Sequence, residues 1–202
     1  MPIITALEVQ KKNKDRVNVF VDDKFFCGLT LDAVVRDRLS VGMNIGEADL
    51  SALQNKSEET DFFTRALNYV LKSPKTEKQV RDYLYRKQCA SGTIHHVIDR
   101  LKALNYINDA NYAQMFTESK QTKLGVRAIK NKLYARGIAS DTVNAAAIEI
   151  AGQTELVHAL AAKYMRNRDS DTKTIAKLFR FLAAKGFDYD DIQTAINLSK
   201  NK

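Results

Sequence analysis

The sequence predicts a mostly helical protein in which three related three-helix units follow a small β-containing segment. Glycine and proline are scarce, at 8 and 2 of 202 residues, which disfavours a turn-rich β architecture. Helix-capping patterns recur from residue 57 onward, and apolar positions repeat there at a constant spacing. Hydrophobic residues make up 45% of the chain, so a chain of this length can bury a core.

Residues 1–56 are typical of a small β/α domain. Residues 17–21 alternate apolar and polar side chains and are rich in β-branched residues, and Asp22 and Asp23 then turn the chain. A strand meander with a helix on one face can bury an apolar surface that a lone hairpin could not. We expect a boundary in the polar stretch 54–59. The expected elements are strands at about 4–10, 17–21 and 24–27, a helix at about 31–39 and a short helix at 47–53.

The helical part contains a 49-residue repeat. Leu84, Leu133 and Leu182 are each 49 residues apart. The same shift aligns five further columns: Val80, Ile129 and Leu178; Lys87, Arg136 and Lys185; Gln88, Gly137 and Gly186; Cys89, Ile138 and Phe187; and Ile94, Val143 and Ile192. Helices share a period, so chance is the alternative, but constant spacing over six columns argues against it.

The repeat divides the helical part into units at 57–107, 108–153 and 154–202. Each unit is expected to contain three helices, and stacked units of this kind form an elongated, curved body with a long exposed surface. Residues 76–79 match a capping box, in which Thr76 and Gln79 satisfy each other's backbone N–H groups. Gly137 and Gly186 each follow a helical run, where glycine favours a left-handed C-cap.

The positive charge of the chain lies entirely in the helical part. The formal net charge is +8, while residues 1–56 carry 8 Lys/Arg and 8 Asp/Glu, so the whole excess belongs to residues 57–202. A localised positive field attracts phosphate backbones or acidic protein surfaces. Plain solubility is the alternative explanation.

Cations and a tyrosine recur on the exposed helix faces of the first two units. At ~100° per residue, Arg127, Lys130 and Tyr134 fall opposite the apolar stripe of their helix. Such side chains can pair with phosphates or carboxylates and can stack, although solvated helix faces also contain Lys and Arg. The third unit departs from this pattern, and its charge gathers elsewhere. The candidate partner- or DNA-binding residues are Lys78, Arg81, Tyr85, Lys87, Lys120, Lys123, Arg127, Lys130, Tyr134, Arg136, Lys173, Lys177 and Arg180.

Catalytic and metal-binding patterns are missing from the sequence. It contains neither a phosphate-binding loop nor a dinucleotide fingerprint, and its three histidines have no ligand-spaced partner. Cys27 and Cys89 are far apart, as expected of reduced cysteines. No leader or apolar run long enough to span a membrane is present. We therefore expect a cytoplasmic, monomeric binding protein without catalytic residues, metal or cofactor.

The chain resembles the RecX family, which regulates the RecA recombinase. The matching runs are residues 66–70 (ALNYV), 75–84 (KTEKQVRDYL), 97–101 (VIDRL) and 105–109 (NYIND), with Tyr112, Ala113, Gly125, Ile129, Leu133, Gly137 and Ile138 downstream. Residues 4–10 and 16–22 resemble an N-terminal extension of some members. One departure is Gln88, which stands where the family usually has glycine, so that helix end is expected to cap differently.

The resemblance implies tandem three-helix units, no catalytic residues and a role in DNA repair, recombination and the SOS response. It also implies binding to RecA filaments in or near the groove, and inhibition of filament growth, ATP hydrolysis and strand exchange. Single- and double-stranded DNA would be weak, salt-sensitive partners. Two alternatives stay open: a helix-turn-helix DNA-binding protein acting on gene expression, and a purely structural scaffold. The first needs a base-reading helix, yet two of the three expected third helices begin with acidic residues.

Overall fold

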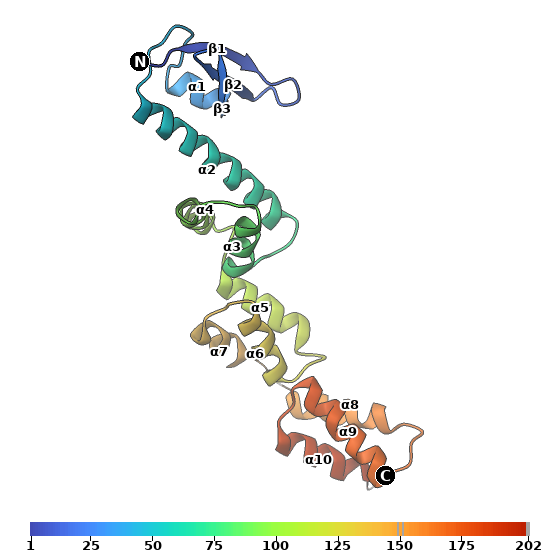
Figure 1. The fold of residues 1–202 in the computed structure, drawn as a ribbon. Helices are drawn as coiled ribbons and strands as arrows, with labels where there is room; N and C mark the ends of the chain where they lie inside the picture. Colours follow the sequence, from blue (N-terminus) through green and yellow to red (C-terminus); the bar gives the residue numbers. More distant parts are fainter. Residues whose placement is uncertain (149, 151, 201–202) are drawn as a thin grey trace. The chain divides into compact units, whose positions relative to one another are not determined.

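The computed structural model describes residues 1–148, 150 and 152–200, and within them it contains one three-stranded sheet and ten helices (Figure 1). Residues 149, 151 and 201–202, which belong to the expected second and third units, lie outside the described residues. By its internal contacts the chain divides into two compact units, residues 1–69 with 84–101 and residues 70–83 with 102–202. The predicted class, three-helix repeats after a small β/α segment, is confirmed.

The N-terminal segment is an antiparallel meander, as expected. Its strands pair in the order β1-β2-β3, and Leu7, Val19 and Cys27 lie in register across the sheet. Asp22 and Asp23 form a two-residue turn with φ of 48° and 62°, which matches the twist of the flanking strands. Helix α1 ends at Arg36, three residues before the expected end. The bounds are β1 (Ile4–Val9), β2 (Arg16–Val21), β3 (Lys24–Thr30) and α1 (Leu31–Arg36).

Helix α2 (Glu47–Leu71) replaces the expected short helix and polar boundary. The prediction that a helix ends near residue 53 was wrong, because residues 47–73 contain no glycine or proline and their polar residues tolerate the helical conformation. Leu50 and Leu53 belong to the apolar core of the N-terminal segment. Ser57, in the supposed linker, is buried. The polar stretch is therefore part of one long helix, with Ser57 on its buried side.

Hydrogen bonds fix the sheet on α2. The carbonyl of Gly28 accepts from the Ser57 hydroxyl and, at 2.8 Å, from Nη2 of Arg16. The Arg16 guanidinium also pairs with Asp61 one turn further along the helix. Because the half-buried Gly28 and Arg16 both bond to side chains of α2, the segment 1–56 and the first half of α2 form one packed body.

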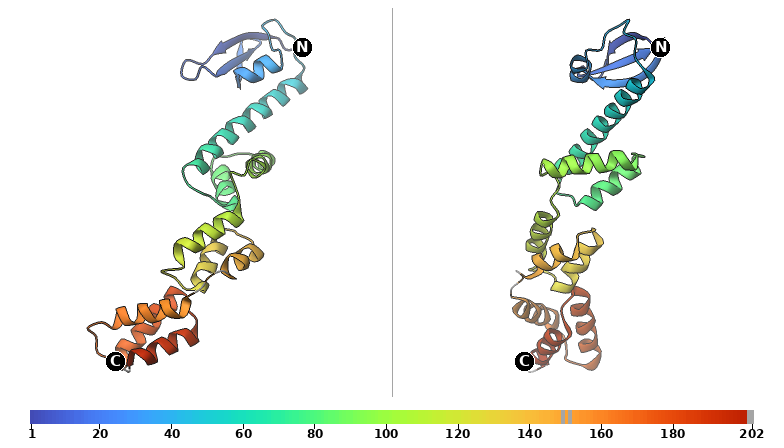
Figure 2. Two further views of the ribbon diagram at one scale, coloured as in Figure 1. Left: turned by 180° about the vertical axis from the view of Figure 1, so that it is seen from behind. Right: turned by 90° about the vertical axis from the view of Figure 1, so that its left-hand side faces the viewer.

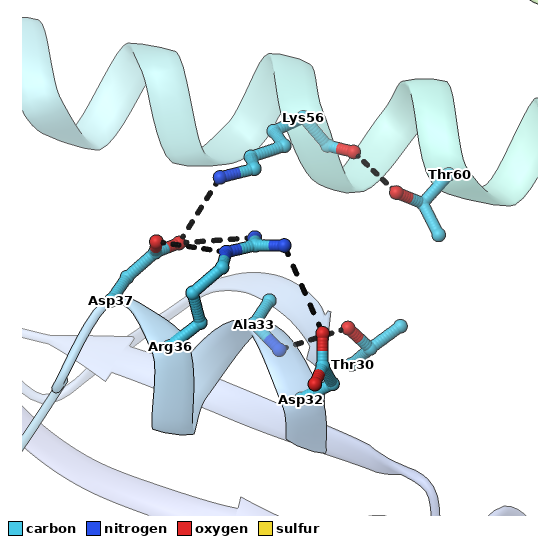
Figure 3. A network of polar contacts seen from close by, with 7 residues as sticks. All are labelled: Thr30, Asp32, Ala33, Arg36, Asp37, Lys56 and Thr60. Carbon is cyan, nitrogen blue, oxygen red and sulfur yellow. Dashed lines mark hydrogen bonds and ion pairs between the residues drawn. The ribbon is translucent and has the colours of Figure 1, made fainter.

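A second set of polar contacts joins the end of α1 to α2 near the surface. Asp37 accepts from Arg36 Nε at 3.3 Å and from Lys56 Nζ at 3.4 Å (Figure 3). The hydrogen bond from Arg36 holds the pKa of the Asp37 carboxyl below its usual value. Since these groups are exposed to solvent, each contact stabilises the junction only weakly.

Of the eight helices that follow α2 in the described part of the chain, six form the compact three-helix cores of the second and third repeats (Figure 2). In the second unit, Ile129 and Leu133 of α6 pack with Ala113 of α5 and Val143 of α7. The third unit packs α8, α9 and α10 around the fully buried Leu178 and Leu182. The bounds are α3 (Glu77–Arg86), α4 (Ser91–Ala103), α5 (Asp109–Lys120), α6 (Val126–Ala135), α7 (Ser140–Ile148), α8 (Gln153–Met165), α9 (Thr172–Lys185) and α10 (Tyr189–Lys200).

The 49-residue repeat appears in the backbone at the C-termini of α3, α6 and α9. In each repeat, one residue at the end of the helix has a left-handed backbone conformation. The backbone N–H of the next residue donates to the carbonyl five residues earlier, which is the Schellman arrangement. These bonds run from Cys89 to Leu84 at 3.2 Å, from Ile138 to Leu133 at 3.3 Å and from Phe187 to Leu182 at 3.4 Å. Gln88 has a φ of 61°, so it takes the same left-handed conformation as Gly137 and Gly186. The expectation that this helix end caps differently was therefore wrong.

Candidate partner-binding faces

The N-terminus of α3 packs on the C-terminus of α6. The capping box is confirmed: Gln79 N–H donates to Thr76 Oγ1 at 3.3 Å, and Thr76 N–H donates to Gln79 Oε1 at 3.1 Å. The Thr76 hydroxyl also donates to the carbonyl of Arg136 at 2.8 Å. One fully buried side chain thus caps its own helix and satisfies the end of the next unit's helix.

Lys78 lies at the same contact. Its Nζ donates to the carbonyl of Ala135 at 3.5 Å, where a cation offsets the helix dipole. Its aliphatic stem lies over Gly137, where a Cβ would come within 2.5 Å of the lysine Cδ. This exposed lysine, a candidate for partner binding, therefore contributes to the packing of the first three-helix repeat on the second.

The contact recurs between the second and third units. Gly125 N–H donates to the carbonyl of Lys185 at 2.9 Å, and Arg127 Nη2 donates to the carbonyl of Ala183 at 3.2 Å. Gly125 and Arg127 stand 49 residues after Thr76 and Lys78. A Cβ on Gly125 would lie 2.3 Å from the carbonyl oxygen of Gly186, so only glycine fits. We call the two contacts the repeat joints; they stack α3, α6 and α9 head to tail.

Three further candidates have intramolecular partners. Arg81 Nη2 lies 2.7 Å from Glu77 Oε1, and Lys102 Nζ lies 2.8 Å from the other oxygen of the same carboxylate. These hydrogen bonds hold the pKa of the Glu77 carboxyl below its usual value, and the bond from Lys102 has the larger effect. Lys130 Nζ donates to Asn144 Oδ1 at 3.0 Å, and Arg180 bonds to the carbonyl of Ala176 in its own helix.

Arg136 is built into the second unit. Its Nε donates to the Tyr112 hydroxyl at 3.0 Å, and its Nη1 donates to the carbonyl of Lys132 at 2.7 Å. The guanidinium lies 4.6 Å from the ring centroid of Phe116, where a cation–π contact adds to the packing. Lys120 lies 5.9 Å from the same ring. Half-buried Arg136 therefore has little capacity left for a partner.

The other candidates are more available. The side chains of Lys87, Lys123, Lys173 and Lys177 are exposed and make no hydrogen bond or ion pair within the described residues. Tyr85 is 72% exposed and Tyr134 is 40% exposed. Of these four lysines, Lys123, Lys173 and Lys177 lie within the unit formed by residues 70–83 and 102–202. We call these three the free lysines.

The two cysteine thiols are buried, which disfavours their reactive thiolate form. Burial raises the pKa of the Cys27 thiol to about 11, so the nucleophilic thiolate is scarce at neutral pH. Burial also raises the pKa of the Cys89 thiol. Across the described part of the chain, no three His, Cys, Asp or Glu side chains come together as metal ligands. Nor does any described helix combine the length and apolarity needed to cross a bilayer.

Comparison with known proteins identifies the family. Models of the "Regulatory protein RecX N-terminal domain" and of the first, second and third three-helix domains of RecX match residues 2–46, 63–101, 108–146 and 152–196. The chain belongs to the RecX family. The matched ranges cover the sheet segment and all three helical units, so the resemblance seen in the sequence extends to the repeat architecture.

Full-length RecX relatives and solved RecX structures agree with this assignment. The regulatory protein RecX of Clostridioides difficile is 36% identical over 98% of this chain and 95% of its own length. The regulatory protein RecX of Clostridium botulinum strain Alaska E43 is 33% identical over 100% of this chain and 98% of its own length. A crystal structure of regulatory protein RecX, 22% identical, superposes with a TM-score of 0.77 over 98% of this chain and all of the other. The crystal structure of RecX from Lactobacillus salivarius, which is 29% identical, superposes with a TM-score of 0.63. This superposition covers 72% of this chain and 98% of the other.

Proposed function

We propose that the chain regulates RecA by docking on RecA–DNA filaments and slowing filament growth, ATP hydrolysis and strand exchange. The observation that carries this proposal is membership of the RecX family over the sheet segment and all three helical units. The chain acts as a cytoplasmic monomer without cofactor, and its role lies in recombination, DNA repair and the SOS response.

The free lysines, together with Lys87, supply the docking charge. Lys78, Arg127 and Arg136 make intramolecular contacts that hold the repeats in place. The free lysines and Lys87, which make no hydrogen bond or ion pair within the described residues, meet acidic RecA surface or DNA phosphates. Each exposed ion pair is weak, but several on one chain add up. Tyr85 and Tyr134 can add stacking or a hydrogen bond.

A helix-turn-helix function is less well supported. Reading a major groove requires base-contacting side chains at the start of a recognition helix, in a strongly positive setting. The first turn of α7 carries Asp141, and the first turn of α10 carries Asp190 and Asp191. These carboxylates would lie against DNA phosphates, so we do not propose gene regulation by base readout.

RecA ATP hydrolysis on single-stranded DNA tests the proposal. We expect the steady-state rate to fall in a dose-dependent way when the protein is added, because fewer RecA protomers stay assembled. An ATPase that depends on single-stranded DNA but is unrelated to RecA serves as control and should keep its rate. An unchanged RecA rate with the protein in excess over RecA would refute regulation through the filament.

A further inference from the structure

The third unit contains a surface groove that the docking proposal does not use. Residues of α8, of the loop that follows it and of α10 line this groove, which has a volume of about 1080 Å³. Met165 and Leu198 line it, and Leu198 is 52% exposed although it is a large apolar side chain. Apolar side chains beside a few polar groups are the usual lining of a ligand site.

The charges around this groove have one sign. Lys163, Arg166 and Arg168 line it, and the described residues of the lining include neither Asp nor Glu. The Arg168 guanidinium is held in place, since it bonds to the carbonyl of Tyr164 and lies 4.4 Å from the centroid of that ring. Lys163 and Arg166 make no side-chain hydrogen bond or ion pair within the described residues. The described lining thus combines apolar side chains with charged side chains that are all positive.

A buried polar atom also lies at the groove. His158 lines it, and the Nε2 atom of His158 is buried without a hydrogen-bond partner among the described residues. Buried polar groups in proteins almost always have a partner, so an unpaired one calls for an explanation. The groove therefore borders a polar group whose hydrogen-bonding capacity is unused within the described residues.

We infer that this groove binds an acidic, amphipathic peptide segment of a partner protein. The carboxylates of such a segment would meet Lys163, Arg166 and Arg168, while its apolar side chains would cover Met165 and Leu198. A nucleic acid fits less well, because it brings no apolar side chains and the described lining offers no Phe, Tyr or Trp on which bases could stack. None of the free lysines lines the groove, so the inference can be tested apart from docking on RecA.

Fluorescence anisotropy with a labelled helical peptide tests this inference without RecA. The probe carries glutamates on one helical face and leucines on the other, and we expect the full-length protein to bind it with micromolar affinity. Lys163→Glu with Arg166→Glu should weaken binding by about tenfold or more, since two attractions become repulsions. Leu198→Ser should weaken it about threefold or more through loss of apolar contact. Circular dichroism confirms that each variant is folded.

Two controls distinguish binding in the groove from attraction of the acidic peptide to the overall positive charge of the protein. Lys72→Glu with Lys132→Glu changes the net charge equally at exposed lysines outside the groove, and should leave peptide affinity unchanged. A peptide with glutamine in place of glutamate should bind poorly. Three results would overturn the inference: no binding of the acidic peptide, equal loss in the control variant, or tighter binding of a single-stranded oligonucleotide that Lys163→Glu with Arg166→Glu abolishes.

Discussion

Gly186→Ala is expected to lower the free energy of unfolding by about 3 kcal/mol, since backbone strain and steric overlap act together. Gly186 has a φ of 86°, which costs an L-residue free energy at any site. A Cβ there would also lie 2.3 Å from the backbone nitrogen of Ala128 and 2.4 Å from its Cβ, so the second repeat joint would have to open. Urea denaturation followed by circular dichroism measures the loss.

Two glycines of the same chain separate the causes. Gly42 has a φ of 87°, and a Cβ added there would meet nothing within 4 Å, so Gly42→Ala reports strain alone and should cost about 1 kcal/mol. Gly92 lies in α4 with open space around it and no positive φ, so Gly92→Ala should be neutral or stabilising by up to about 1 kcal/mol. If Gly186→Ala cost no more than Gly42→Ala, the close packing of the repeat joint would be disproved.

Reversing the free lysines, Lys123→Glu with Lys173→Glu and Lys177→Glu, is expected to raise the concentration needed to halve RecA ATP hydrolysis by about 10- to 100-fold. None of the three side chains has a hydrogen bond or ion pair within the described residues, so folding should not suffer. The measurement is a titration of RecA on single-stranded DNA with the natural protein and with the variant.

A charge-matched control removes the effect of net charge. Lys11, Lys12 and Lys14 are exposed in the loop between β1 and β2, and reversing all three changes the charge by the same amount. This variant should inhibit RecA nearly as well as the natural protein. Equal weakening by both variants would mean that total charge, not the placement of the free lysines, decides inhibition.

The apolar pattern predicted the repeat well because core positions are dictated by helix geometry. Leu84, Leu133 and Leu182 are each fully buried, as their 49-residue spacing required. The left-handed C-caps followed from the same spacing at Gly137 and Gly186. Gln88 was misjudged because glycine prefers this conformation without being the sole residue that adopts it.

The roles of the cations could not be predicted from helix faces alone. A helical projection places Lys78 and Arg127 on the exposed side, but it does not show that the C-terminus of another helix lies there. One signal was available in the sequence. Thr76 precedes Lys78 by two residues, and 49 residues later Gly125 precedes Arg127 by two residues, which indicates a recurring contact within the chain. The end of the helix expected at 47–53 was misplaced for a related reason, since a polar stretch on a long helix resembles a linker.

We propose that some cations hold the repeats together while the free lysines bind the filament. The most direct test of this division is how binding to RecA filaments on single-stranded DNA depends on salt. Fluorescence anisotropy of a labelled filament, titrated at increasing sodium chloride, gives the slope of log affinity against log salt. We predict a steep slope for the natural protein and a slope shallower by about 0.7 for each free lysine that contacts a phosphate and is replaced by glutamine. Identical slopes and affinities for the natural protein and for Lys123→Gln with Lys173→Gln and Lys177→Gln would contradict the account.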